Sequence, residues 1–178
     1  MAKHYVVHVL CLFTPLSLVL MQGLDYFHIE SVSMCEEVPN QAVKFYLSPR
    51  DSVPGLQRVD INLTSNKPIG ENTKLKCTGY SEINKRWIRL FHYEDDFCHT
   101  FNTYVGQLFY DMERAAGILP GTCPMPKGNY HIVNFTLDYQ KLKLQSFPFG
   151  KMKYLLECSD KTTKAVTSCL NIVIVNHA

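Results

Sequence analysis

The 7 cysteines are the first residues of this sequence that could do chemistry. Cys11 lies in an apolar N-terminal run, and the other six form an even number, which is typical of disulfide pairing in an oxidising compartment. A zinc site would need close pairs of cysteine and histidine ligands, and Cys98 beside His99 has no second pair at ligand spacing. We therefore predict three disulfide bridges and no metal site, from Cys35, Cys77, Cys98, Cys123, Cys158 and Cys169.

A cluster of carboxyl and imidazole groups could in principle supply an acid and a base. Glu94, Asp95 and Asp96 lie between His92 and His99. However, a helix N-terminus favours negative charge at such a place, and catalysis needs mutual geometry as well as the residue types. The sequence also lacks the G-x-S-x-G, H-E-x-x-H, phosphate-loop and dinucleotide-binding motifs. We expect a protein that is not an enzyme and carries no cofactor.

The N-terminus has the layout of a secretory signal peptide. Lys3 precedes an apolar run over residues 5–21, and the first acidic residue is Asp25. The run approaches the length of a membrane span, about 20 residues, but Pro15 interrupts it. We predict cleavage after Gly23 and secretion to the extracellular space, with a retained N-terminal anchor as the alternative.

The mature chain, residues 24–178, fits a single domain. Cleavage removes one lysine, so 18 basic and 16 acidic residues become 17 and 16, a net charge of +1. This near-neutral balance gives no case for a nucleic-acid partner. No internal repeat or linker divides the chain. Two Asn-x-Ser/Thr triplets, at Asn62 and Asn134, predict N-glycosylation in a secreted chain.

Most of the chain alternates between apolar and polar residues, which predicts β-strands. Bulky side chains occupy both faces of residues 86–93, so we expect this strand to lie between two layers. Residues 151–158 and 166–175 are expected to pair as a hairpin across the polar turn 159–164. The other predicted strands cover residues 43–47, 59–63, 74–80 and 130–137.

One segment departs from the alternation and predicts an amphipathic helix of about four to five turns. It begins near Asp95 or Asp96, either of which can cap it, and Gly117 and Pro120 end it. Its apolar stripe either packs on the sheet, the usual role of such a stripe, or lines part of an apolar cavity. The candidate cavity residues are Phe101, Val105, Leu108, Phe109 and Met112.

Residues 139–149 are a second candidate for contact with a ligand. Leu142, Leu144, Phe147 and Phe149 alternate with lysine and polar residues up to Pro148. This composition suits an apolar rim beside a cavity mouth, and it suits an ordinary edge strand and turn slightly better. We expect the lysines nearby to be solvated rather than bound to a ligand headgroup.

An ordered set of motifs resembles a known family. Asn-Lys-Pro at residues 66–68 follows a strand, Asp-Phe-Cys at 96–98 opens the predicted helix, and Phe-Pro-Phe-Gly at 147–150 precedes the last hairpin. The strongest motif is CPMPKGNY at residues 123–130, followed by Asn-Phe-Thr at 134–136. Together these motifs resemble the DUF1091 family of insect secreted proteins, which includes the CheA and CheB chemosensory proteins. That family is related to the lipid-recognition fold of the GM2 activator and MD-2.

The resemblance implies a mostly β protein, an antiparallel β-sandwich or β-cup with one amphipathic helix and disulfide braces. Its sheets would splay apart to hold an acyl chain or similar apolar ligand, because closely packed sheets, about 10 Å apart, leave no room. It also implies the bridge Cys98–Cys123. For the other cysteines it favours Cys35–Cys169 with Cys77–Cys158, while spacing leaves Cys158–Cys169 with Cys35–Cys77 open.

We therefore expect an extracellular, non-enzymatic binding protein for a small apolar ligand, a lipid or hydrocarbon pheromone, in insect chemosensation. One alternative keeps the fold and makes the chain an accessory protein that binds a membrane receptor or another extracellular protein. A second alternative is a secreted structural or reproductive protein with a filled core and no ligand. An enclosed apolar cavity would favour the first function, and an exposed apolar patch would favour a protein partner.

Overall fold

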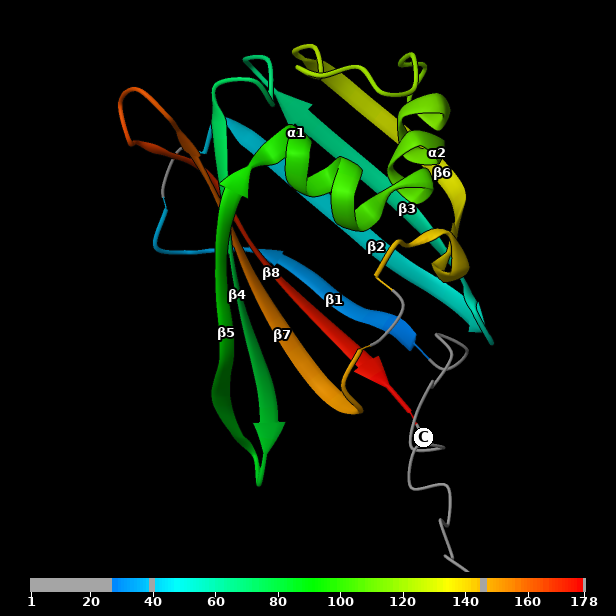
Figure 1. Ribbon diagram of the computed structural model, residues 1–178. Helices are drawn as coiled ribbons and strands as arrows, with labels where there is room; N and C mark the ends of the chain where they lie inside the picture. The colour runs from blue at the N-terminus through cyan, green and yellow to red at the C-terminus, as the bar shows by residue number, and fades with distance from the viewer. Residues whose placement is uncertain (1–26, 39–40, 145–146, 178) are drawn as a thin grey trace, which may run out of the picture.

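Eight β-strands and a short helical segment make up residues 27–38, 41–144 and 147–177, the part of the chain that the computed structural model describes (Figure 1). The predicted signal peptide, residues 1–23, lies outside the described residues. No helix in the described part is long and apolar enough to cross a membrane. The strands are β1 (Phe27–Met34), β2 (Val43–Val53), β3 (Leu56–Ser65), β4 (Thr73–Ile83), β5 (Arg86–Asp96), β6 (Gly128–Asp138), β7 (Gly150–Asp160) and β8 (Val166–Asn176). The helices are α1 (Phe97–Thr100), the π-helical turn η3 (Phe101–Val105), α2 (Gln107–Ala115) and the 3-10 turn η4 (Tyr139–Lys141).

The strands pair antiparallel in two sheets. The larger sheet has the order β1-β8-β7-β4-β5, and the smaller sheet has the order β2-β3-β6. The predicted class, a mostly β antiparallel sandwich with disulfides, is confirmed, and β7 and β8 form the expected hairpin. Each predicted strand falls within an observed one. Alternation does not predict β1, because a register shift between Ile29 and Ser31 moves its apolar residues out of step.

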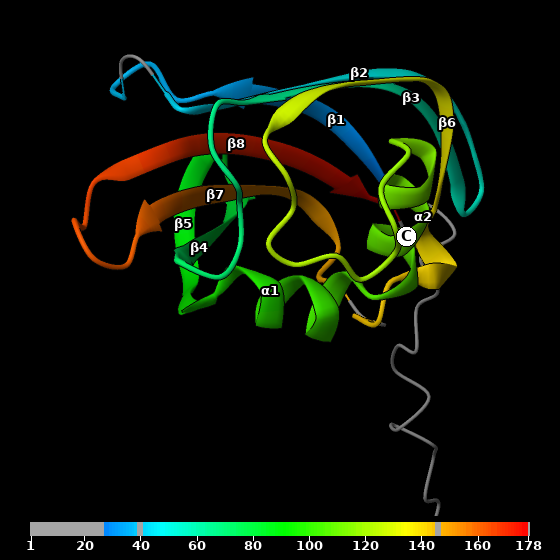
Figure 2. The same cartoon turned by 90° about the horizontal axis from the view of Figure 1, so that it is seen from above.

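The two sheets meet along one side and diverge toward the other. β1 and β2 lie side by side although they belong to different sheets, and β5 and β6 are the opposite edges. The helical segment is the connection between β5 and β6, so it runs across the side where the sheets stand furthest apart (Figure 2). The result is a cup-shaped cross-section.

A buried amide ties the two sheets together. Gln57, on β3 of the smaller sheet, is 3% exposed. Its Nε2 donates to the carbonyl oxygen of Ile29 on β1, and its Oε1 accepts from the Ile29 N–H, both at 2.9 Å. The hydroxyl of Tyr139 also donates to this Oε1. These bonds join β3 of the smaller sheet to β1 of the larger sheet, although no described strand of one sheet pairs with a strand of the other. Gln57 therefore fixes the distance between β1 and β3.

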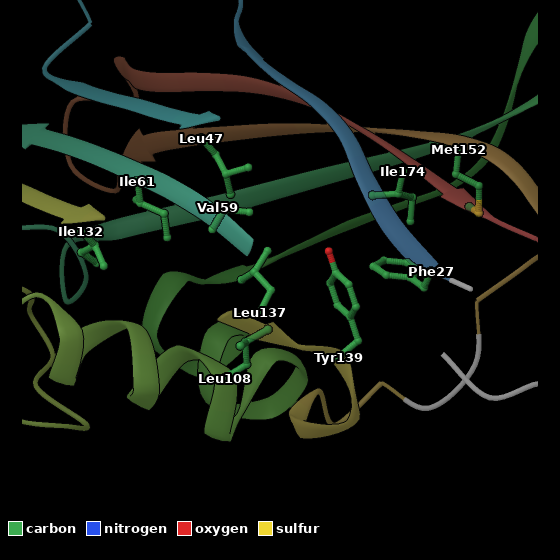
Figure 3. Packing of buried hydrophobic residues seen from close by; sticks show 10 residues of the cluster. All are labelled: Phe27, Leu47, Val59, Ile61, Leu108, Ile132, Leu137, Tyr139, Met152 and Ile174. Carbon is green, nitrogen blue, oxygen red and sulfur yellow. The ribbon is translucent and has the colours of Figure 1, made fainter. Parts of the chain in front are cut away.

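Two apolar clusters fill the space around this bridge. The larger cluster gathers side chains from both sheets, from α2 and from η4 (Figure 3): Phe27, Leu47, Val59, Ile61, Leu108, Ile132, Leu137, Tyr139, Met152 and Ile174. The smaller cluster surrounds the start of the helical segment: Val43, Ile69, Phe97, Ile118 and Met125. Burial of one such large side chain stabilises the fold by about 1.5–3 kcal/mol, so these clusters hold the helical segment on the sheets.

The helical segment is broken, so the prediction of one continuous helix is wrong. Gly106 has φ 61° and ψ −129°, a conformation that favours glycine, and it separates η3 from α2. Its N–H donates to the Phe101 carbonyl at 2.9 Å, the longer-range bond of a π-turn. A side chain at 106 would also meet Lys143, whose Cγ lies 2.8 Å from the ideal Cβ position. Asp96 is the N-cap residue, but its side chain makes no capping hydrogen bond.

β5 is an edge strand, which corrects the expectation that it lies between two layers. Within the described residues it pairs with β4 alone. Trp87 is 36% exposed, and Ile88, Leu90 and Phe91 are more than 40% exposed. The bulky side chains on both faces of β5 are therefore exposed apolar surface, and the strand is not enclosed between two layers.

Candidate apolar binding surface

One register row carries small or apolar residues across all five strands of the larger sheet. From β1 to β5 the row contains Val32, Ile172, Tyr154, Gly79 and Phe91. Val32, Ile172 and Tyr154 pack against the larger cluster, so the row lies on the inner face of the sheet, toward the smaller sheet. It ends at Phe91, which is 41% exposed.

The neighbouring row shows the same change from buried to exposed. It contains Ile174, Met152, Ser81 and Ile88. Met152 is 1% exposed, whereas Ile88, two strands away, is 47% exposed. The smaller sheet has only three strands, and it leaves the β5 end of this inner face uncovered.

Aromatic rings connect the exposed end to the core. The ring centroids of Phe91 and Tyr154 are 6.1 Å apart, and those of Tyr154 and Phe147 are 6.4 Å apart. Phe147 contacts Phe27 at 4.6 Å, and Phe27 contacts the fully buried Tyr139 at 4.7 Å. We call Ile88, Phe91, Phe147 and Tyr154 the inner apolar surface.

The inner apolar surface contains one neutral polar group, the Tyr154 hydroxyl, and a second, the Cys77 thiol, lies close to it. The Tyr154 hydroxyl contacts the sulfur of Met152 at 3.7 Å, a weak acceptor, so it retains capacity to donate to a ligand oxygen. Burial raises the pKa of Tyr154 above its ordinary value, and burial raises the pKa of the Cys77 thiol to about 11. Both groups are therefore uncharged at neutral pH, as suits contact with hydrocarbon.

Residues 139–144 are held against the helical segment and form no edge strand. The N–H groups of Lys143 and Leu144 donate to the Tyr104 carbonyl at 3.2 and 3.3 Å. The Lys141 ammonium pairs with Asp111 of α2 at 2.7 Å. Hydrogen bonding to Lys141 is the largest of the effects that lower the pKa of Asp111 to about 2. The Lys143 ammonium donates to the Asn102 carbonyl at 2.8 Å. Lys141 and Lys143 thus contact protein groups while both residues stay exposed to solvent.

The predicted ligand residues divide into three environments. Leu108 is buried in the larger cluster, and Val105, Met112, Leu142 and Phe147 pack against that cluster. Phe101 and Phe109 pack against the smaller cluster. Leu144 is 40% exposed, and Phe149 is half-buried outside both clusters. Among these nine, only Phe147 joins the inner apolar surface.

Sequence reasoning missed Ile88, Phe91 and Tyr154. Alternation identified their strands, but it could not show that β5 is an edge or that β7 lies two strands from it. The available signal was the glycine at position 79, which removes the side chain that would otherwise stand in the row.

Two disulfides brace the fold. Cys98 at the start of α1 is bonded to Cys123, the pair that the resemblance implies, with a Cα–Cα distance of 6.1 Å. Cys35 is bonded to Cys169, with a Cα–Cα distance of 5.3 Å. Gly70 packs on the first bridge, since a Cβ there would lie 2.6 Å from the Cys123 sulfur.

The prediction of a third bridge is wrong. Cys77 and Cys158 are free thiols, so neither Cys77–Cys158 nor the competing pairs that used them are formed. The register places Cys77 opposite Leu156 and Cys158 opposite Leu75. The two cysteines are therefore diagonal neighbours, and such residues stand about 7–8 Å apart, beyond the usual reach of a disulfide.

The acidic cluster at the start of α1 has a structural arrangement. The Tyr93 hydroxyl donates to Asp95 at 2.7 Å, and His99 Nδ1 lies 2.5 Å from the same carboxylate. The bond from Tyr93 is the first cause of a pKa near 2 for Asp95, followed by the Asp96 N–H and His99. Within residues 27–38, 41–144 and 147–177, no cluster of acids, cysteines and histidines could hold a metal ion.

Both predicted glycosylation sites have exposed side chains on the smaller sheet. Asn62 lies on β3, where it is hydrogen-bonded to His131, and Asn134 lies on β6 with φ 57°. The Asn134 N–H donates to Asp60 at 2.7 Å. Glycosylation itself stays a prediction.

Two hollows lie away from the inner apolar surface. One, of about 410 Å³, adjoins the Cys98–Cys123 bridge and includes Asp96, His99 and Lys161 in its lining. The other, of about 340 Å³, includes Lys44 and Thr64. Both are open to solvent, so neither is the enclosed apolar cavity that would favour a carrier.

Residues 76–156 match the model of a family described as protein of unknown function (DUF1091). The matched segment contains the Cys98–Cys123 bridge, the CPMPKGNY motif, Gly79 and all four residues of the inner apolar surface. The relation to DUF1091 that the motifs predict is therefore confirmed over this segment.

The fold is also similar to the crystal structure of chicken MD-1 complexed with lipid IVa, with a TM-score of 0.41 and 13% sequence identity. The alignment covers 85% of this chain and 98% of that chain. No curated protein matches the sequence.

Proposed function

We propose that this chain is a secreted, non-enzymatic binding protein for a small apolar ligand, a lipid or a hydrocarbon. The observation that carries the proposal is the series of rings from exposed Phe91 through Tyr154 and Phe147 to the core. Apolar contact is favoured by about 25 cal/mol per Å² removed from water, so a long hydrocarbon can bind without an ionic anchor.

The chemistry of the surface suggests how a ligand is oriented. Ile88 and Phe91 contact the hydrocarbon, and the Tyr154 hydroxyl donates to an oxygen such as that of a carbonyl or alcohol. A single neutral donor favours weakly polar ligands over ions, because none of the four residues of the inner apolar surface is charged.

Secretion and a chemosensory role complete the proposal. The two disulfides support an oxidising compartment, as does the signal peptide expected at residues 1–23. The role in insect chemosensation rests on the resemblance of the motifs to the CheA and CheB proteins.

Binding of a fluorescent long-chain fatty acid tests this function. Phe91→Ser should weaken binding about tenfold, because it removes a ring from the inner face. Trp87→Ser is the matched control, since Trp87 is on the same strand and its ring contacts Lys153 on the outer face. Equal losses in both variants, or no binding by the unaltered protein, would contradict the proposal.

A second candidate function is an accessory protein for a receptor or another extracellular protein. The observation that favours it is the exposure of Ile83, Trp87 and Leu90. Exposed apolar patches of this kind mark protein contacts. Specific retention by an extracellular receptor, lost in Trp87→Ser but kept in Phe91→Ser, would support this function.

A further inference from the structure

We infer that β5 is a self-association edge, at which two copies of this chain pair antiparallel and join their larger sheets. This goes beyond the proposed ligand binding, which uses the inner face of one copy. Within the described residues β5 has a neighbour on one side only, although the strand is 11 residues long. Its other side presents main-chain groups that can pair with a strand.

The centre of β5 favours pairing, because its apolar side chains are exposed. Edge strands that stay unpaired are usually short, charged along their length or interrupted by proline. β5 contains no proline. Five of its 11 residues are charged and its register shifts at Leu90, yet Trp87, Ile88, Leu90 and Phe91 expose apolar surface at its centre. Pairing with another strand would remove part of this surface from water.

The charges of β5 select a second copy as the partner. Its first half carries Arg86 and Arg89, and its last three residues are Glu94, Asp95 and Asp96. An antiparallel copy sets the basic half of one strand against the acidic half of the other. A parallel copy would instead set like charges against each other, which is destabilising.

One antiparallel register that keeps the existing irregularity of β5 brings Arg89 and Glu94 together. Gly79 pairs with Phe91 and Tyr80 with Arg89, so Leu90 has no partner in β4. If the same irregularity is kept toward a second copy, His92 lies opposite His92 on a two-fold axis and Arg89 lies opposite Glu94. Arg89 and Glu94 both lie on the outer face of the sheet, so their side chains can meet, twice in each dimer.

The local contacts leave these groups accessible. The Glu94 side chain is 34% exposed although it pairs with Lys74 at 2.8 Å, so its carboxylate can accept a second cation. Arg89 is exposed. The two predicted glycans would stand on β3 and β6 of the smaller sheet, away from β5.

Analytical ultracentrifugation over a concentration series tests the dimer. It compares the unaltered protein with two variants in which the charge at one position is reversed. Arg89→Glu and Glu94→Lys should each weaken self-association at least about tenfold, because each places like charges opposite each other at two sites. An equimolar mixture of the two variants should recover a heterodimer, since every opposed pair is then complementary. Thermal melts check that each variant is folded.

Cross-linking tests the register. His92→Cys should form an intermolecular disulfide under mild oxidation, because residues opposite each other in antiparallel strands have Cα atoms about 4.5–5.5 Å apart. Leu119→Cys is the control, since Leu119 is 78% exposed in a loop and should not cross-link. The inference would be overturned if the protein were a monomer at every concentration. It would also be overturned if a dimer formed whose stability did not change with the charge exchange and whose His92→Cys variant formed no intermolecular disulfide. Fatty-acid binding is measured separately, so failure of one proposal leaves the other standing.

Discussion

The ring of Phe91 lies across Gly79 on the neighbouring strand, so closely that a Cβ at residue 79 would stand 2.3 Å from its Cε1 atom. The missing side chain lets the ring lie on the sheet and reach toward Tyr154, 6.1 Å away. One glycine therefore determines where the exposed end of the inner apolar surface lies.

Gly79→Ala should displace this ring and lower the affinity for a fluorescent fatty acid about three- to tenfold. The ring can swing outward, so the free energy of unfolding should change by less than about 1 kcal/mol. Val133→Ala, at an exposed position on β6, is the control and should leave both quantities unchanged. Unchanged affinity in Gly79→Ala would remove Phe91 from the binding surface.

Phe109→Ala should cost stability rather than binding. The centroid of the Phe109 ring lies 4.7 Å from that of Phe101, with the two rings tilted, and Phe109 packs on the smaller cluster, not on the inner apolar surface. Loss of a core phenylalanine costs about 3–5 kcal/mol, and partial burial of Phe109 favours the lower figure. Chemical denaturation measures the loss. If fatty-acid affinity per folded molecule falls instead, the stripe of the helical segment has a ligand role.

Gln57→Leu should destabilise the protein by about 2–4 kcal/mol, because it leaves both main-chain groups of Ile29 and the Tyr139 hydroxyl without their amide partner. Gln140→Leu serves as the control, since Gln140 is exposed. Urea denaturation of both variants gives the comparison. A loss no greater than that of the control would show that the sheets are not held by this amide.

Stability should also depend on the protonation of Glu113. This side chain is 2% exposed, and its Oε2 accepts a hydrogen bond from Gly121 N–H at 2.6 Å while Oε1 has no partner among the described residues. Burial raises the pKa of Glu113 above its ordinary value of 4.5. A carboxyl group with a raised pKa favours the folded state when protonated, so its contribution is present below pH 4.5 and is lost as the pH rises.

Glu113→Gln stays neutral at every pH, so it should unfold at higher temperature than the unaltered protein at pH 7. The difference should vanish below pH 4.5. Glu71→Gln, at an exposed site, should show no such dependence. Melting curves between pH 3 and pH 8 check this, and a constant difference across that range would contradict it.

The strands could be predicted from sequence because alternation reports the two faces of each one. Their order could not, since it depends on which distant strands pair: β4 pairs with β7, more than 60 residues away. This is why β5 was expected to be enclosed and why Phe91 and Tyr154 were not recognised as neighbours. The break at Gly106 was missed for a similar reason, because Lys143 fills the space beside it from a distant segment.

The cysteines show the same limit. Composition indicated disulfide bonding, and the motifs implied the bridge at the start of α1. An even count, however, does not require that every thiol is paired. Cys77 and Cys158 lie on adjacent strands but two residues out of register.

Native mass spectrometry of the protein secreted from insect cells, followed by organic extraction, tests the central claim most directly. We predict a co-purified lipid or hydrocarbon at near one-to-one with the folded chain, or its uptake when a long-chain fatty acid is added. A mass matching the glycosylated chain with two disulfides alone, with no uptake of added fatty acids or hydrocarbons, would contradict the assignment of this surface to an apolar ligand.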